Sequence, residues 1–354
     1  MGLSIGIVGL PNVGKSTLFT ALTRKSVGAS NYPFCTIEPN VGVVAVPDAR
    51  LERVAEIFRP EKVTPATVEF VDIAGLVKGA NEGEGLGNQF LSHIREVDAI
   101  CEVVRFFADE NVVHVGGVVN PASDVETIRT ELVLADLETT ERVAARLDKE
   151  AKKDKTLESK LEIVKRLEAW MEQGHRAGRM EMTAEERVLL RDLHLLTMKP
   201  TLYVANVDEA DIGHTFSEID GQMPIPICAK IEAELAELDP SELAEYLQAE
   251  GLEEPGLNVL IRRAFSLLGL ESFFTGGPKE VRAWTISKGS TAVEAAGEIH
   301  TDFARGFIKA EVISFEDLDR LGSEAAARAQ GRLRIEGKDY IVADGDVMHF
   351  RFNV

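Results

Sequence analysis

Gly9-Leu10-Pro11-Asn12-Val13-Gly14-Lys15-Ser16 decides the fold, because it fits the phosphate-loop pattern GxxxxGK[ST]. The apolar run Ile5-Gly6-Ile7-Val8 precedes it and Thr17-Leu18-Phe19 follows it, so a buried strand is expected to turn into a helix here. In that setting backbone N–H groups converge on an anion at the positive end of the helix dipole. The stretch therefore predicts a nucleotide-phosphate site. A chance Gly/Lys turn is the alternative, and the flanking strand and helix disfavour it.

The loop and two positions further along the chain predict a magnesium–nucleotide site. Lys15 is expected to reach the β- and γ-phosphates, and the Ser16 hydroxyl is expected to bind Mg²⁺. Asp72-Ile73-Ala74-Gly75 is a DxxG motif at the end of a second apolar run. Its aspartate is expected to hold a Mg²⁺-bound water and the Gly75 N–H to meet the γ-phosphate. Thr36, between the two motifs, is a candidate further ligand of Mg²⁺.

The sequence lacks the glutamine that orients the attacking water in Ras-like hydrolases. Leu76 directly follows DxxG, where a Ras-like enzyme carries its water-orienting glutamine. Leucine can neither donate nor accept a hydrogen bond, so hydrolysis is expected to be slow or to use another side chain. His114, in the loop after a third strand at residues 99–104, is a candidate to orient the attacking water. The alternative for this lone histidine is a packing role.

Asn206-Val207-Asp208-Glu209 stands where a guanine-binding protein has Asn-Lys-x-Asp. The aspartate of that pattern accepts two hydrogen bonds from guanine, but Glu209 is one methylene longer and is expected to miss this geometry. Val207 removes the lysine stem that flanks the base. A site that cannot pair with guanine loses the discrimination that these bonds supply. Adenine, read by Asn206 and backbone carbonyls, is expected instead.

The composition of the 354 residues limits the class of protein. A hydrophobic content of 45% supports buried cores in about two or three domains. No apolar run approaches the roughly 18 residues of a membrane span, and no secretion signal opens the sequence, so a cytoplasmic protein with no membrane partner is expected. Three cysteines, Cys35, Cys101 and Cys228, are too few and too scattered for a disulfide framework or a zinc site.

The order of patterns along the chain predicts three parts. Short apolar runs alternate with helical patterns over residues 1–126 and again over 200–275, which predicts an α/β domain of the P-loop NTPase type. Residues 127–199 carry apolar positions at helical spacing, which predicts an inserted α-helical hairpin whose third helix begins at a Thr183 to Glu186 capping box. Residues 276–354 alternate strands and helices, including one helix over 315–329, as in a β-grasp module.

The chain resembles the YchF-type Obg-like ATPases in motifs that span nearly its whole length. The matching segments are Gly9-Leu10-Pro11-Asn12-Val13-Gly14-Lys15-Ser16-Thr17, Asn31-Tyr32-Pro33-Phe34-Cys35-Thr36-Ile37-Glu38-Pro39-Asn40, Asp72-Ile73-Ala74-Gly75-Leu76, Asn206-Val207-Asp208-Glu209, His300-Thr301-Asp302-Phe303 and Asp344-Gly345-Asp346-Val347-Met348-His349-Phe350-Arg351-Phe352.

The resemblance implies an ATPase domain, a coiled-coil insert and a C-terminal TGS domain of the ubiquitin-like β-grasp type. It also implies a preference for ATP over GTP and association with the ribosome, at its large subunit. Cys228-Ala229-Lys230 stands where relatives often have Ser-Ala-Lys. The nucleotide-binding residues that it implies are Asn12, Val13, Gly14, Lys15, Ser16, Thr17, Gly75, Asn206, Val207, Glu209 and Cys228.

A potassium ion and ribosomal RNA are two further expected ligands. Asn12 resembles a phosphate-loop asparagine that ligates potassium in some relatives, a positive charge that could replace an arginine finger; a turn residue is the alternative. The formal charge of −20 disfavours uniform wrapping by nucleic acid, yet the insert carries a basic cluster that could contact ribosomal RNA or form a solvated helix face. Its members are Arg142, Arg146, Lys149, Lys152, Lys153, Lys155, Lys160, Lys165 and Arg166.

Three functions remain open from the sequence. The first is slow Mg²⁺-dependent ATP hydrolysis that drives a conformational switch on the translation machinery. The second is a nucleotide-gated module that binds ribosomal RNA or protein, with incidental hydrolysis. The third is a GTPase, which Asn206-Val207-Asp208-Glu209 disfavours.

Overall fold

The computed structural model describes residues 3–24, 40–73, 86–114 and 117–353. The chain forms two compact units, Met1–Gly42 with Glu69–Leu260, and Val43–Val68 with Ile261–Val354. These units divide the chain differently from the predicted domains. Residues 43–68 and 261–275 belong to the C-terminal unit, and the helical insert belongs to the nucleotide-binding unit. Among the described residues, no helix is long and apolar enough to cross a membrane.

The phosphate loop follows a strand in the middle of a six-stranded sheet of order β2-β4-β1-β5-β6-β7. Neighbouring strands from β4 to β7 run parallel, which places their carboxyl ends at one edge. The phosphate loop follows β1, and Asp72 and Asn206 are the last residues of β4 and β6, so the topology gathers the predicted site. The five strands predicted here are confirmed, as β1 Ser4–Val8, β4 Thr67–Asp72, β5 Ala99–Arg105, β6 Thr201–Asn206 and β7 Ile225–Ile227, and β2 Val41–Ala45 is a further strand that was not predicted.

The first helix after the phosphate loop has a buried apolar face. In α1 (Lys15–Arg24), which begins directly at the phosphate loop, Leu18 and Leu22 are fully buried. Helix α8 begins with a capping box and ends at Gly251, whose left-handed backbone closes the last turn. The remaining bounds are α3 Leu86–Glu96, α7 Ala229–Leu235, α8 Pro240–Glu250 and α9 Gly256–Leu267.

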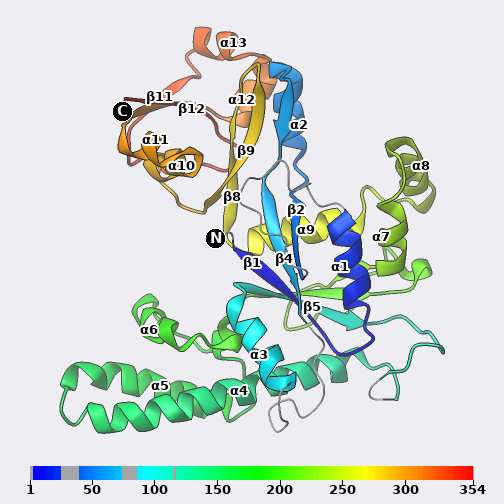
Figure 1. The fold of residues 1–354 in the computed structure, drawn as a ribbon, viewed down its shortest axis with the longest axis vertical. Helices are drawn as coiled ribbons and strands as arrows, with labels where there is room; N and C mark the ends of the chain where they lie inside the picture. The colour runs from blue at the N-terminus through cyan, green and yellow to red at the C-terminus, as the bar shows by residue number, and fades with distance from the viewer. Residues whose placement is uncertain (1–2, 25–39, 74–85, 115–116, 354) are drawn as a thin grey trace. The chain divides into compact units, whose positions relative to one another are not determined.

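The predicted helical hairpin is confirmed as an antiparallel pair of helices, which lie side by side in Figure 1. It consists of α4 (Pro121–Glu150) and α5 (Glu158–Met171), followed by α6 (Ala184–Leu190). The Thr183 to Glu186 capping box is present at the start of α6. Apolar residues from the three helices and the segment after them form a separate core that includes Leu147, Val164, Leu167, Met171, Leu190 and Leu193.

The C-terminal unit contains a mixed sheet of order β11-β10-β12-β8-β9-β3, with helix α10 packed against it. Its strands are β3 Lys62–Thr64, β8 Leu270–Thr275, β9 Glu280–Ser287, β10 Phe307–Ile313, β11 Arg334–Glu336 and β12 Val347–Phe352. Strand β8 lies between β12, to which it is parallel, and β9, to which it is antiparallel. The sheet core includes Phe273, Ile286, Ala296, Ala310, Val312 and Met348.

The single helix predicted over 315–329 was wrong, because two helices occupy this segment. Gly322 stands between them with φ of +72°, a left-handed backbone conformation that ends the first helix. Ser323 then caps the second helix by accepting a hydrogen bond from the Ala326 N–H. The helices of the C-terminal unit are α2 Ala49–Phe58, α10 Ala292–Ile299, α11 Thr301–Arg305, α12 Phe315–Leu321 and α13 Glu324–Ala329.

Candidate functional site

The phosphate loop has the backbone that its sequence predicts. Asn12 and Gly14 both have positive φ angles, of 63° and 97°. Glycine adopts this conformation without steric cost, and space requires glycine at position 14 as well. A Cβ there would lie 2.2 Å from Nδ2 of Asn206. Any side chain at this position would therefore displace the residue that joins the loop to β6.

Lys15 is buried at the start of α1, and its ammonium donates a hydrogen bond of 2.8 Å to the Leu10 carbonyl oxygen. Burial lowers the pKa of Lys15 to about 8, although the Asp72 carboxylate opposes the shift. A phosphate anion would stabilise the charged ammonium in the same way as Asp72 does. The geometry thus places a partly desolvated cation inside the loop that is expected to hold the phosphates.

Ser16 and Asp72 face each other across the same site. The Ser16 hydroxyl donates to Asp72 Oδ2 over 3.4 Å. Burial raises the pKa of Asp72, and Lys15 and the Ser16 hydrogen bond oppose this. A hydroxyl and a carboxylate are hard oxygen donors that fit a divalent cation, which takes its other ligands from phosphates and waters. No cluster of three or more His, Cys, Asp or Glu side chains that could hold a metal occurs among the described residues. Thr36 and Gly75 lie outside the described residues.

The Asn206 side chain connects the base-binding motif to the phosphate loop. Its Nδ2 donates to the Val13 carbonyl oxygen over 2.8 Å, and its Oδ1 accepts from the Ala229 N–H over 3.1 Å. One side chain therefore joins β6, the phosphate loop and the start of α7. A base reader was expected at this position; the structure shows a scaffold role that the sequence pattern did not reveal.

The other expected base-binding residues differ in exposure. Val207 is buried, and its N–H donates to the Ile227 carbonyl oxygen. Cys228 is also buried at the start of α7, and burial raises the pKa of its thiol. Glu209 is exposed at the beginning of a short 3-10 turn, Glu209–Asp211, so its carboxylate is accessible to a ligand.

Arg105 fixes the loop that carries His114, a role that the sequence analysis missed. This buried guanidinium donates to the carbonyl oxygens of Phe107, Asp109 and Val112 over 3.0 to 3.2 Å. Its carbon also lies 4.3 Å from the centroid of the Phe107 ring. The available signal was a charged residue at the end of a strand that is apolar apart from Glu102.

The same loop is bonded to the base-binding motif and to the phosphate loop. The N–H groups of Phe106 and Phe107 donate to the Asn206 carbonyl oxygen, and the Ala108 N–H donates to Asp208 Oδ2. At the other end of the loop, Asn12 Nδ2 donates to the Val113 carbonyl oxygen over 3.1 Å. The residue before His114 therefore contacts the phosphate loop directly.

The His114 side chain is paired with the first turn of α4. Its Nε2 lies 2.9 Å from Asp124 Oδ2, and only 7% of the His114 side chain and 8% of the Asp124 side chain are exposed. His114 therefore follows a residue, Val113, that contacts the phosphate loop. The imidazole itself is engaged with an acid that sequence reasoning did not select.

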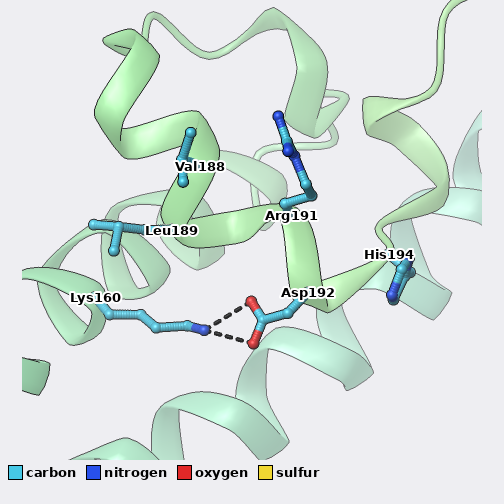
Figure 2. A pocket seen from close by; sticks show the side chains of 6 residues that line it. All are labelled: Lys160, Val188, Leu189, Arg191, Asp192 and His194. Carbon is cyan, nitrogen blue, oxygen red and sulfur yellow. Dashed lines mark hydrogen bonds and ion pairs between the residues drawn. The ribbon is translucent and has the colours of Figure 1, made fainter. Parts of the chain in front are cut away.

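A separate cavity of about 510 Å³ lies on the helical insert. Figure 2 shows Lys160 from α5 and Asp192 from the segment after α6 facing each other there, with the Lys160 ammonium hydrogen-bonded to both carboxylate oxygens of Asp192. Val188, Leu189, Arg191 and His194 complete the lining. None of the predicted nucleotide-site residues borders this cavity.

The fold and the phosphate site define a P-loop nucleotide-binding protein of the GTPase superfamily. The sequence profile of the 50S ribosome-binding GTPases, MMR_HSR1, matches residues 4–160. The profile YchF-GTPase_C, described as a protein of unknown function, matches residues 270–353.

The chain belongs to the YchF family. It is 53% identical to the ribosome-binding ATPase YchF of Escherichia coli O157:H7 and 52% identical to that of Bacillus subtilis (strain 168), each over 100% of both chains. The solved structure of the Schizosaccharomyces pombe YchF GTPase superposes with a TM-score of 0.90 at 36% identity, covering 99% of this chain and 98% of that chain. The likeness extends through both compact units.

Proposed function

We propose that this protein is a ribosome-binding ATPase that hydrolyses ATP slowly with Mg²⁺ and uses the bound nucleotide as a conformational switch in the cytoplasm. The observation that carries the proposal is the assembled phosphate site, in which Lys15, Ser16 and Asp72 converge at the carboxyl edge of a parallel sheet. Full-length relatives named ribosome-binding ATPases support the same function. The match to a 50S ribosome-binding profile favours the large subunit as partner.

In the proposed reaction, the residues of the loop bind and orient the triphosphate. Backbone N–H groups from Asn12 to Thr17 cradle the phosphates, while the Lys15 ammonium neutralises charge on the β- and γ-phosphates. Ser16, Thr36 and Asp72 would hold Mg²⁺, directly or through water, and the Gly75 N–H would meet the γ-phosphate. When bound, the metal neutralises charge that develops on the transferred phosphoryl group.

His114 is the proposed group that orients the attacking water, since its neighbour Val113 contacts the phosphate loop. His114→Ala is expected to lower kcat by at least about tenfold with little change in ATP affinity, because a water-orienting group acts mainly in the transition state. Lys15→Ala and Ser16→Ala serve as references that remove hydrolysis. A normal rate in His114→Ala would return this residue to a packing role.

Asn12 could hold potassium through the oxygen of its side chain, because the nitrogen already donates to Val113. We expect faster hydrolysis in potassium than in sodium if this oxygen is a ligand. Asn12→Ala should then remove the difference between the two ions. Equal rates in both salts with the unmodified protein would leave Asn12 as a turn residue.

The choice of base tests the ATPase proposal most directly. The bacterial relatives are named ATPases, whereas the Schizosaccharomyces pombe relative is named a GTPase. Glu209 is exposed but too long for the paired hydrogen bonds that guanine requires, and a mispaired polar contact costs about 1–3 kcal/mol. ATP should bind at least about tenfold more tightly than GTP.

Isothermal titration with both nucleotides would measure this preference. The double variant Val207→Lys with Glu209→Asp should shift it toward GTP, because it restores the lysine and the shorter acid of the guanine pattern. Lys15→Ala is the control, since it should weaken both nucleotides alike. Tighter binding of GTP than of ATP by the unmodified protein would overturn the proposal.

A nucleotide-gated binding module is the second candidate, and the covered state of the His114 side chain favours it. Co-sedimentation with ribosomes in ATP, ADP or no nucleotide separates the two candidates when it is paired with a hydrolysis-deficient variant. If release from the ribosome depends on hydrolysis, the hydrolysis-deficient variant should remain bound to the ribosome in ATP. A gated module should respond to ATP in the same way with or without hydrolysis.

A further inference from the structure

Asp124 holds the side chain that the proposed reaction needs. The two side chains, His114 and Asp124, meet at 2.9 Å and are both more than nine-tenths covered. Hydrogen bonds to a charged group are stronger than those between neutral groups, so this contact biases the position of the imidazole. A ring this covered can contact an attacking water only if the pair opens or the ring turns.

The loop around His114 is otherwise firmly held. Arg105 binds three of its carbonyl oxygens, and Asn12 binds the Val113 carbonyl oxygen. These contacts keep the backbone beside the phosphate loop whatever the side chain of His114 does. The contact with Asp124 can therefore change while these backbone contacts remain in place.

Asp124 belongs to an element that extends far from the phosphate loop. It lies in the first turn of α4, a helix of 30 residues and therefore about 45 Å long. Further along α4, the buried Asp136 accepts hydrogen bonds from the Leu196 and Thr197 N–H groups, both at 2.8 Å, which fixes the helix to the return segment of the insert. A force on the insert that shifts or tilts α4 would reach Asp124.

We propose that Asp124 is a positioning residue that retains His114 away from the attacking water, and that displacement of α4 releases it. This inference depends on the proposed role of His114 in hydrolysis. It also assigns a role to α4: a partner that binds the insert and displaces this helix would change the rate of ATP hydrolysis. Slow basal turnover follows, because the retained state has to open before each catalytic event.

The test compares kcat for ATP in six forms of the full chain, namely the unmodified protein, four single variants and one double variant. Asp124→Asn keeps the shape but loses the charge, and it should raise basal kcat at least about threefold with little change in KM. Asp124→Glu keeps the carboxylate and should remain near the unmodified rate. Asn120→Ala is the matched control, because it removes the N-cap of α4 without removing the pair. In the His114→Ala background, Asp124→Asn should have no effect.

A second measurement reports the pair itself. Diethylpyrocarbonate modifies accessible imidazoles, and peptide mass spectrometry can compare labelling of His114 with that of the exposed His214 in the same sample. Labelling of His114 relative to His214 should increase at least about threefold in Asp124→Asn and remain unchanged in Asn120→Ala.

Three results would overturn the inference. Unchanged His114 labelling in Asp124→Asn would show that the acid does not cover the ring. A lower kcat in this variant would make Asp124 an aid to catalysis, and an equal rise in the His114→Ala background would make its effect independent of the histidine. If His114→Ala alone leaves the rate unchanged, the proposed role of His114 fails, and the labelling still shows separately whether Asp124 retains the ring.

Discussion

Glu102 is an acid inside the nucleotide-binding sheet, and its surroundings are unusual for a carboxylate. It lies on β5 with almost no exposed surface, and no hydrogen-bond partner is seen for its Oε1 atom among the described residues. Burial raises its pKa to about 8, with Arg176 and Arg129 acting in the opposite direction. The side chain is therefore largely protonated in the folded protein at pH 7, whereas in an unfolded chain it would be ionised.

This difference predicts how stability depends on pH. The folded state binds more protons than the unfolded state between pH about 4.5 and about 8, so the contribution of Glu102 falls as pH rises through this window. Glu102→Gln carries no titrating group and should lack this loss. We expect the variant to gain roughly 1–3 kcal/mol over the unmodified protein between pH 5 and pH 8.5.

Urea unfolding followed through Trp170 fluorescence in a Trp284→Phe background, at several pH values for both proteins, would measure the difference. Trp170 lies on α5 and reports the unit that contains Glu102. Cys101→Ser, at the neighbouring buried position, is a control for general disturbance of the strand. A stability gap that stays constant from pH 5 to pH 8.5 would show that Glu102 is ionised in the fold.

Asn206 and Arg105 mark the limit of sequence reasoning at single residues. Lys15, Ser16 and Asp72 could be chosen because a short local pattern fixes their chemistry, and the structure brings them together. The bond from Asn206 to Val13 joins positions 193 apart, and the bonds from Arg105 depend on the path of an irregular loop. Neither set of bonds is marked in the sequence by a short motif or by a regular spacing of residues.

At the scale of elements, the insert uses many of its basic residues internally. Lys160 pairs with Asp192, Lys165 with Asp148 and Arg166 with Glu186. These ion pairs join helices or segments of the insert and reduce the charge that is available to a partner. Among the described residues, no acidic partner is seen for Arg146, Lys149, Lys153 and Lys155.

The unpaired residues of the helical hairpin are the ones that RNA could contact. Reversing Lys149, Lys153 and Lys155 to Glu should weaken ribosome binding and reduce its dependence on salt, because each lost phosphate contact lowers the salt exponent by about 0.7–0.9. Co-sedimentation with ribosomes over a series of potassium chloride concentrations would measure both effects.

A matched control reverses three exposed lysines of the C-terminal unit, Lys279, Lys288 and Lys338, with the same change in net charge. This control should bind ribosomes with the salt dependence of the unmodified protein. Weaker binding in the control alone would place the docking surface on the C-terminal unit. Salt-insensitive binding by the unmodified protein would exclude a dominant phosphate contact.

At the scale of the whole molecule, the sequence predicts most elements but not how the chain is divided. Strands, the helical hairpin and its capping box follow from periodicity and local caps, and all are present. The assignment of residues 43–68 to the C-terminal unit depends on pairing of β3 with β9, more than 200 residues apart. The place of β8 depends on the same kind of long-range pairing.

The position of β8 predicts which C-terminal fragments can fold. A fragment of residues 276–354 follows the predicted boundary but lacks β8, which stands between β12 and β9 in the sheet. It also loses the fully buried Phe273 and Phe274, each worth about 1.5–3 kcal/mol of burial. We expect this fragment to show no cooperative unfolding, whereas residues 261–354 should unfold in a single transition.

Trp284 is the natural reporter, because it is the single tryptophan in both fragments and contacts β8 directly. Its indole N–H donates to Thr275 Oγ1 over 2.9 Å, and its ring stacks on Phe273 at 6.4 Å between centroids. Near-ultraviolet circular dichroism and urea titration of Trp284 fluorescence should show a fixed environment only in the longer fragment. Phe274→Ala in that fragment should lower its urea midpoint, because it empties a buried position beside β12. A cooperative transition in residues 276–354 with the midpoint of the longer fragment would mean that β8 is dispensable, and the division of the chain at residue 276 would then hold.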